Sequence, residues 1–219
     1  MKSYGQWCSL ATALDVVGER WSLLIVRELL IGGARRYTDL RDGIPGIATD
    51  VLASRLKDLE DDGIVRRREL PPPAASKVYE LTELGEGLAP AVAALARWGS
   101  QLLGPMTDAM TFRPHWLAFG LRGMLRADRA ADVRLEVDFE VELEDPVRVR
   151  VDRGALTYDA QPTADPDIVV RSDLSTLSSI ANGSLPIVDA AAAGRFAIEG
   201  EPDAVAAFQR LFPQPRVDA

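Results

Sequence analysis

The chain has 219 residues, of which 47% are hydrophobic and 26% charged, as is typical of a globular protein. This length is enough for two modest domains that each bury a core. Neither a run of about 18 apolar residues nor a secretory signal occurs, so a membrane protein and an exported protein are not expected. The single cysteine cannot form an internal disulfide, which favours the cytoplasm.

The formal net charge of −8 is distributed unevenly along the chain. Residues 1–104 carry 13 basic and 14 acidic side chains, a net charge of −1, whereas residues 105–219 carry 12 and 19, a net charge of −7. The acidity therefore belongs to the second half. A local basic face in the first half can still bind the phosphates of a nucleic acid.

The first half shows mainly helical periodicity. Helices are predicted over 8–17, 21–30 and 37–42, and a Gly-Ile-Pro-Gly turn at 43–46 leads to a fourth helix over about 48–62. Its leucines, Leu52, Leu56 and Leu59, share one face. Two extended runs, 64–70 and 77–81, predict a hairpin with a proline-rich tip at 71–76. One further helix is predicted from Thr82 to about residue 103.

We place the domain boundary at Gly104-Pro105, where the pattern changes. A helix over about 114–125 is followed by strict alternation of apolar and polar residues over 133–143, which predicts a strand with one buried face. Further strands are predicted at 147–151, 155–160, 168–171 and 196–198, and helices after Asp173, over 188–193 and after Pro202. The second half is expected to be an α+β domain with an antiparallel sheet and helices on one side.

Helices linked by a tight turn and followed by a hairpin predict a winged helix-turn-helix in residues 1–104. The fourth helix would enter the major groove of DNA, because short polar side chains at its start allow close approach to base edges. Basic residues of the hairpin would contact phosphates, and alternation places Arg67 on the opposite face from Arg66 and Arg68. The candidate DNA-contacting residues are Thr38, Thr49, Asp50, Ser54, Arg55, Lys57, Arg66, Arg67, Arg68 and Lys77.

Residues 8–99 resemble the HxlR-type winged helix regulators of bacteria. The matching stretches are LDVVGERW at 14–21, RELL at 27–30, RYTDL at 36–40, IPGI at 44–47, LASRLKDLE at 52–60, GIV at 63–65, YELTELG at 79–85 and ARWG at 96–99. The resemblance implies a homodimer, built from the first and last helices of this domain, that binds an inverted repeat. It also implies DNA contacts by Thr49, Asp50, Ser54, Arg55 and Arg67. The chain departs from the family at Ser9, where a proline is usual, and at the early prolines 71–73.

Cys8 offers a second way to regulate such a protein. Some members of the family use a cysteine at this place as a redox or electrophile switch, through an intersubunit disulfide or thiol modification. The alternative is a small apolar residue that packs on the first helix.

The second half contains few residues suited to catalysis. His115 is the single histidine, no His/Cys group has metal-ligand spacing, and no nucleotide-binding or hydrolase motif occurs, so neither an enzyme, a metal nor a cofactor is expected. His115, next to Trp116 at a helix start, is interpreted as structural.

Residues 133–212 resemble the domains of sterol carrier protein type two, through the strand and helix order and the segment AAAAGRFAIEGEP at 190–202. The resemblance implies an α+β sheet domain of sterol-carrier type over 105–219 that holds a hydrophobic ligand. The alternative is a closed core that the same side chains fill. The candidate wall residues are Trp116, Phe119, Met124, Val137, Phe139, Ile180, Phe196, Ile198, Phe208 and Phe212.

These observations together predict a cytoplasmic DNA-binding regulator, dimeric, with binding tuned by a hydrophobic small molecule in the second domain and with no membrane partner. One alternative is a regulator switched at Cys8 whose second domain binds no ligand. The other is a lipid carrier or enzyme that uses the helical half as an interaction module.

Overall fold

The computed structural model describes residues 3–71, 76–104, 106–107, 109–141, 143, 146–160 and 164–213. These residues form two compact units, Met1–Val92 and Ala93–Ala219. The division falls within helix α6 (Ala89–Ser100), earlier in the chain than the boundary at Gly104-Pro105 that the composition suggests. Within the described ranges, no helix is long and apolar enough to cross a membrane.

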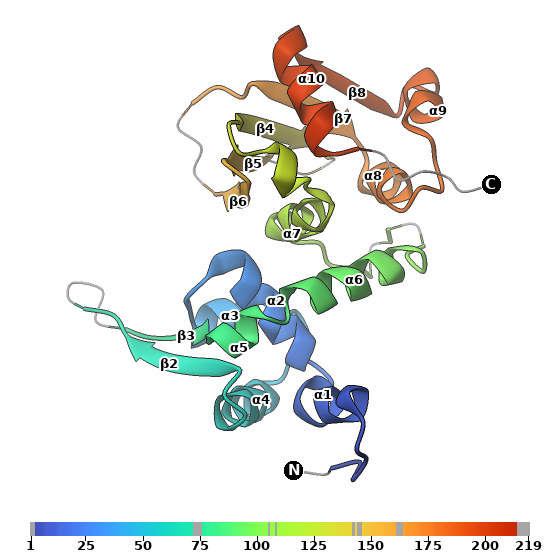
Figure 1. Ribbon diagram of the computed structural model, residues 1–219. Helices are drawn as coiled ribbons and strands as arrows, with labels where there is room; N and C mark the ends of the chain where they lie inside the picture. The colour runs from blue at the N-terminus through green and yellow to red at the C-terminus, as the bar shows by residue number, and fades with distance from the viewer. Residues whose placement is uncertain are drawn as a thin grey trace. The chain divides into compact units, whose positions relative to one another are not determined.

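The first unit is mostly helical, with a small three-stranded sheet. The sheet has the order β1-β3-β2 with antiparallel neighbours, and the hairpin of β2 and β3 projects away from the helices of this unit (Figure 1). The two-residue strand β1 was not predicted, because two residues are too few to show an alternating pattern. The elements in chain order are α1 (Ser9–Val17), α2 (Ser22–Gly32), β1 (Arg35–Arg36), α3 (Tyr37–Gly43), α4 (Thr49–Asp61), β2 (Val65–Glu69), β3 (Lys77–Leu81) and α5 (Glu83–Glu86).

The core of this unit forms around α2, as the apolar character of that helix predicts. Ile25, Val26 and Leu29 are almost completely buried, and the leucine stripe of α4 packs there with Leu40 of α3. Burial of each such side chain contributes roughly 1.5–3 kcal/mol. The core therefore fixes which face of α4 points outward.

One expectation for this part of the chain was wrong. The single helix predicted over 82–103 is divided into α5 and α6, because Pro90 has no N–H to continue a helix from Glu86 and Gly87 lies between them. Two apolar stripes of this part of the chain are exposed. They are formed by Leu10 and Leu14 of α1, and by Leu84, Leu95, Trp98 and Leu102 in and after α5 and α6.

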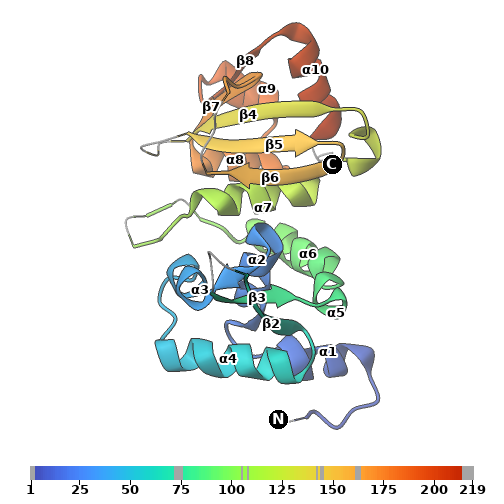
Figure 2. The same cartoon turned by 90° about the vertical axis from the view of Figure 1, so that its left-hand side faces the viewer.

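The second unit is a five-stranded sheet of order β6-β5-β4-β7-β8 with helices on one face (Figure 2). The expectation of a purely antiparallel sheet was wrong, because β7 runs parallel to β4. The chain leaves the sheet at the edge strand β6 and returns beside β4, so β7 starts at the same end of the sheet as β4. The elements are α7 (Pro114–Met124), a 3-10 turn (Ala127–Arg129), β4 (Arg134–Glu140), β5 (Val147–Asp152), β6 (Ala155–Asp159), β7 (Ile168–Ser172), α8 (Leu174–Ala181), α9 (Ile187–Ala192), β8 (Phe196–Gly200) and α10 (Pro202–Leu211).

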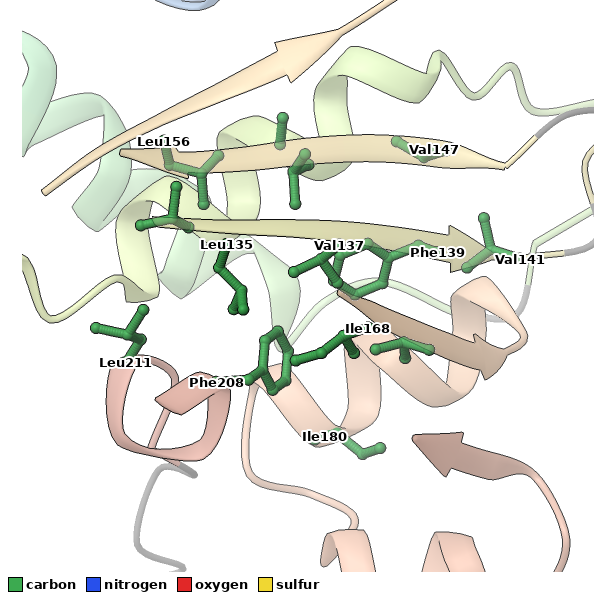
Figure 3. Close-up of a cluster of buried hydrophobic side chains, with 14 of the residues drawn as sticks. Leu135, Val137, Phe139, Val141, Val147, Leu156, Ile168, Ile180, Phe208 and Leu211 are labelled. Atoms are coloured by element: carbon green, nitrogen blue, oxygen red, sulfur yellow. The ribbon is translucent and has the colours of Figure 1, made fainter. Parts of the chain in front are cut away.

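The alternation that predicts β4 also determines its two faces. Leu135, Val137 and Phe139 point into a core shared with Phe208 and Leu211 of α10 (Figure 3). Helices α7, α8 and α9 each add a residue to the same cluster, so all four helices lie on the apolar face. The predicted strand at 133–143 ends at Glu140 in the structure.

The opposite face of the sheet carries paired charges. Arg148 of β5 has a side chain only 5% exposed, and it makes a two-bond contact with Asp138 on β4 and donates to the carbonyl of Ala164 at 2.9 Å. Arg150 lies between Glu136 at 2.5 Å and Asp159 at 2.9 Å. The predicted polar face is thus a network of arginine–carboxylate pairs.

Candidate nucleic-acid interface

A short turn joins α3 to α4 in the geometry of a helix-turn-helix. The hydroxyl of Tyr37 at the start of α3 donates to the carbonyl of Thr49 at the start of α4, at 2.6 Å. Gly46 in the turn has φ +83°, which a residue without Cβ adopts at no steric cost. Gly43 lies against the buried carboxylate of Glu28, so a Cβ there would be 2.6 Å from Glu28 Oε2. Close packing therefore fixes α3 against α2, and the Tyr37 hydrogen bond joins α3 to the start of α4.

The outer face of α4 carries the short polar residues that the sequence singles out. Thr49, Asp50, Ser54 and Lys57 are all exposed, on the side opposite the buried leucines. These side chains form a polar face that can lie against the major groove of a duplex.

Arg55 differs from its neighbours on α4 because the protein itself binds its guanidinium. The side chain is 22% exposed and pairs with Asp58 at 3.2 Å and with Glu19, in the linker between α1 and α2, at 3.7 Å. A contact between Arg55 and DNA would have to compete with these carboxylates.

The arginines of β2 also have partners. Arg66 and Arg68 both donate to Glu80 on β3, through Nε to separate oxygens at 2.8 and 2.9 Å. Burial alone would raise the pKa of the Glu80 carboxyl, but the hydrogen bonds from Arg68 and Arg66 hold it below its usual value.

Arg67 lies on the other face of the hairpin, as strand alternation predicts. It donates to Glu60 of α4 at 2.6 Å, and its guanidinium lies 5.4 Å from the centre of the Tyr79 ring. The hydrogen bond to Glu60 raises the pKa of Arg67 above its ordinary value. The wing and α4 are therefore tied together by a charged pair.

Lys57 and Lys77 complete the candidate cations, and Thr38 is exposed on α3. Neither lysine has an ion pair with any residue that the structure describes. The tip of the wing, where the sequence places its early prolines, lies largely outside the described residues, at 72–75.

Sequence reasoning missed the acidic partners, namely Glu19, Asp58, Glu60 and Glu80, together with Tyr37. The register of the hairpin pairs Arg66 directly with Glu80 and Arg67 with Tyr79. Knowledge of that register would have identified Glu80 as a partner of Arg66. The register cannot be fixed from sequence alone, because a connection of several residues joins the two strands.

The candidate ligand-wall residues of the second unit divide into two groups. Seven lie in the core cluster or pack against it: Val137, Phe139, Ile180, Phe196, Ile198, Phe208 and Phe212. The ring centres of Phe139 and Phe208 are 6.4 Å apart and those of Phe208 and Phe212 are 4.9 Å apart. Trp116, Phe119 and Met124, all on α7, are half-buried outside this cluster.

Two residues with possible chemistry lie elsewhere. The ring of His115 contacts the rings of Trp116 and Tyr158, with centres 6.0 and 6.2 Å apart. Cys8 is exposed at the N-cap of α1, where the backbone N–H groups of Ala11 and Leu10 lower the pKa of its thiol. Among the described residues, no group of three His, Cys, Asp or Glu side chains could hold a metal ion.

Comparisons with known proteins give different matches for the two parts of the chain. Residues 16–107 match the HxlR-like helix-turn-helix family, and residues 118–218 match the alkyl sulfatase C-terminal family. The sterol-carrier resemblance of the second part is therefore not confirmed.

Several bacterial regulators are similar to the first part. The chain is 34% identical over 93 residues to the uncharacterized HTH-type transcriptional regulator YvaP of Bacillus subtilis, over 42% of this chain and 85% of that protein. It is 34% identical over 96 residues to the regulator YodB of the same organism, over 44% and 85%. A solved structure of reduced YodB from B. subtilis has 33% identity and a TM-score of 0.40, covering 47% of this chain and all of that one. The chain belongs, through its N-terminal part, to the HxlR-like helix-turn-helix family of DNA-binding transcriptional regulators.

Proposed function

We propose that this regulator acts in the cytoplasm as a homodimer that binds an inverted repeat, with α4 as the reader helix. The observation that carries the proposal is the division of α4 into a fully buried leucine stripe and an exposed face of short polar residues. A rigid helix with such a face, beside a projecting hairpin, fits the major groove and an adjacent stretch of backbone. Phosphate contacts by Lys57 and Lys77 would add affinity without reading sequence.

The exposed apolar stripes support the dimer. Trp7, Leu10 and Leu14 recur at three- and four-residue spacing along α1 and the two residues before it, and all three are exposed. Leu95, Trp98 and Leu102 repeat this spacing on α6 and just beyond it. Large apolar side chains clustered on helix faces are typical of surfaces that a second copy covers. Substitution of Leu10 by glutamate should therefore give a monomer in sedimentation analysis, and a variant that stays dimeric would remove this argument.

Footprinting tests the DNA-binding arrangement. A duplex enriched by the wild-type chain from a random pool should show two protected half-sites about 34 Å apart, one helical turn, because a two-fold dimer places two reader helices on one side of the duplex. A single half-site, or protection without symmetry, would contradict the dimeric reading. Failure to enrich any duplex would contradict DNA binding itself.

The second unit is proposed to sense a hydrophobic small molecule between its sheet and its helices, as a binding domain without catalytic activity. Support comes from its aromatic interior, where Phe139, Phe208 and Phe212 form a contiguous group. A ligand would alter DNA binding only through different affinities for two arrangements of the dimer. Native mass spectrometry of the purified chain should retain an apolar ligand. A ligand-free spectrum, and no heat of binding with long-chain fatty acids, would count against this role.

Cys8 supports a second candidate, regulation by oxidants or electrophiles. Its thiol is exposed, and hydrogen bonds from the backbone of Ala11 and Leu10 lower its pKa, which favours the reactive thiolate. Alkylation by iodoacetamide should reach half its maximal rate at a lower pH than for a free cysteine. The Cys8→Ser variant should bind DNA and lose any response to diamide, whereas an unchanged response would eliminate Cys8 as the switch.

A further inference from the structure

Carboxylates of the protein bind the arginines of the wing, which is the hairpin of β2 and β3, and one carboxylate binds two of them. Glu80, whose side chain is 14% exposed, accepts one hydrogen bond from Arg66 and one from Arg68, each on a different oxygen. Arg66 lies directly across the hairpin from Glu80, and Arg68 lies diagonally across from it. One carboxylate thus holds two guanidinium groups on the same face of the hairpin.

The contacts leave the outer ends of both arginines available. Each guanidinium uses its Nε–H for Glu80, and in the described part of the chain the two terminal nitrogens of Arg66 and Arg68 have no hydrogen-bond partner. Both side chains are at least about half exposed. A guanidinium held by its Nε edge keeps its fork of terminal donors in a fixed direction, which suits bidentate contact with a phosphate.

We propose that Glu80 is a positioning residue that determines specificity, by fixing Arg66 and Arg68 for phosphates of the correct site while opposing attachment to other DNA. The inference rests on the proposed DNA-binding function. It assigns to Glu80 a role that a simple count of basic residues in the wing would miss.

Two effects of Glu80 act in opposite directions on the two kinds of DNA complex. Non-specific binding is almost entirely electrostatic, so a carboxylate beside the cations weakens it. Specific binding needs a fixed register of the protein on the duplex, so two preorganised guanidiniums strengthen it. The ratio of specific to non-specific affinity is therefore higher with Glu80 than without it.

The test compares Glu80→Gln with Glu69→Gln, the matched control. Glu69 is exposed on β2, the other strand of the same hairpin, and no described residue forms an ion pair with it, so both variants remove one negative charge from the hairpin. Anisotropy titrations would use the duplex enriched by the wild-type chain and a scrambled duplex of equal length and composition, at fixed salt.

For Glu80→Gln we expect the ratio of the two affinities to fall about fivefold, the upper end of what one partly exposed ion pair contributes. For Glu69→Gln both affinities should rise together, with a ratio unchanged within about twofold. Equal ratios for the two variants, or a higher ratio for Glu80→Gln, would overturn the inference. A wild-type chain that prefers no duplex would instead refute the proposed function, and the inference with it.

Glu80→Asp provides a second variant that keeps the charge. Its carboxylate is one methylene shorter and cannot reach both arginines, so specific affinity should fall while affinity for the scrambled duplex stays the same. Circular dichroism of each variant establishes that the first unit, which contains the wing, is folded. If Glu80→Gln fails to fold, an unchanged ratio for folded Glu80→Asp contradicts the inference by itself.

Discussion

Asp173 stabilises the second unit through the start of α8. Its Oδ1 accepts from the Thr176 N–H at 2.7 Å and its Oδ2 from the Thr176 hydroxyl at 2.6 Å. Burial alone would raise the pKa of this carboxyl, but these hydrogen bonds outweigh it and hold the pKa below the ordinary 3.8. The stabilisation is therefore present above the unfolded pKa and is lost as pH falls through the lower folded value.

Substitution of Asp173 by alanine should lower the free energy of unfolding by about 1 kcal/mol at neutral pH, as for other N-cap losses. The difference from wild type should shrink as urea unfolding is measured at pH values below about 4. Asp203→Ala, which removes an exposed carboxylate from the first turn of α10, is the control and should change stability by less than about half as much. A deficit for Asp173→Ala that is constant with pH would contradict this role.

On the polar face of the sheet, loss of Asp138 is expected to lower the free energy of unfolding the most. Asparagine there would leave the nearly buried guanidinium of Arg148 without its two-bond partner, and Glu136 lies only at 3.9 Å. We expect a loss of about 3 kcal/mol, because removal of one member of a buried pair leaves a charge uncompensated. Asp152→Asn, which breaks the exposed pairs with Arg134 and Arg153, should cost under about 1 kcal/mol. Equal losses in chemical denaturation would show that burial of Arg148 does not matter.

At the scale of elements, the close approach of α2 and α3 holds the helix-turn-helix together. A methyl group at Gly43 would lie 2.6 Å from Oε2 of Glu28, which is 3% exposed and pairs with Arg27 at 2.8 Å. Gly43→Ala should therefore destabilise the first unit by about 1–3 kcal/mol, the usual cost of overpacking.

The control for Gly43→Ala is Gly120→Ala in α7, where nothing lies within 4 Å of the added methyl group. This change should be neutral or stabilise by up to about 1 kcal/mol, because alanine favours a helix interior. In thermal unfolding, the melting temperature should fall for Gly43→Ala and should stay the same or rise for Gly120→Ala. A stabilised Gly43→Ala would mean that α3 can move away from α2 without cost.

Elements whose identity depends on local pattern could be predicted from the sequence. The leucine spacing in α4 and the alternation around Val137 each fix a buried face, and both faces are buried in the structure. The parallel placement of β7 beside β4 could not be predicted, because it depends on where the chain returns to the sheet after β6. The same holds for β1, which exists only through its pairing with β3.

The candidate site was predictable to a different extent. Residue type and helical phase identified the exposed polar face of α4. They could not reveal that Arg55, Arg66, Arg67 and Arg68 are all bound to carboxylates, since those partners, apart from Asp58 on α4 itself, come from other elements. Charge pairing across elements is a tertiary property, and it changes which cations can contact phosphate without competition: Lys57 and Lys77.

For the whole molecule, the charge is distributed unevenly between the two parts of the chain. Residues 105–219 carry a net charge of −7, whereas the part that contains the helix-turn-helix is close to neutral. The arginines of the wing and of α4 are all paired with carboxylates, so phosphate contacts there add little net positive charge and the salt dependence of binding should be shallow. On the proposed function, sequence recognition by α4 would then supply much of the affinity.

The most direct test of this account is an anisotropy titration of the enriched duplex with wild type and two glutamate variants. Ser54→Glu adds a negative charge to the exposed face of α4, and Ser175→Glu adds the same charge to an exposed position of α8. If α4 reads the duplex, Ser54→Glu should lose at least about tenfold in affinity, because like charges brought together oppose binding, while Ser175→Glu should bind as wild type does. Equal affinities for the two variants would contradict the assignment of α4 as the reader helix.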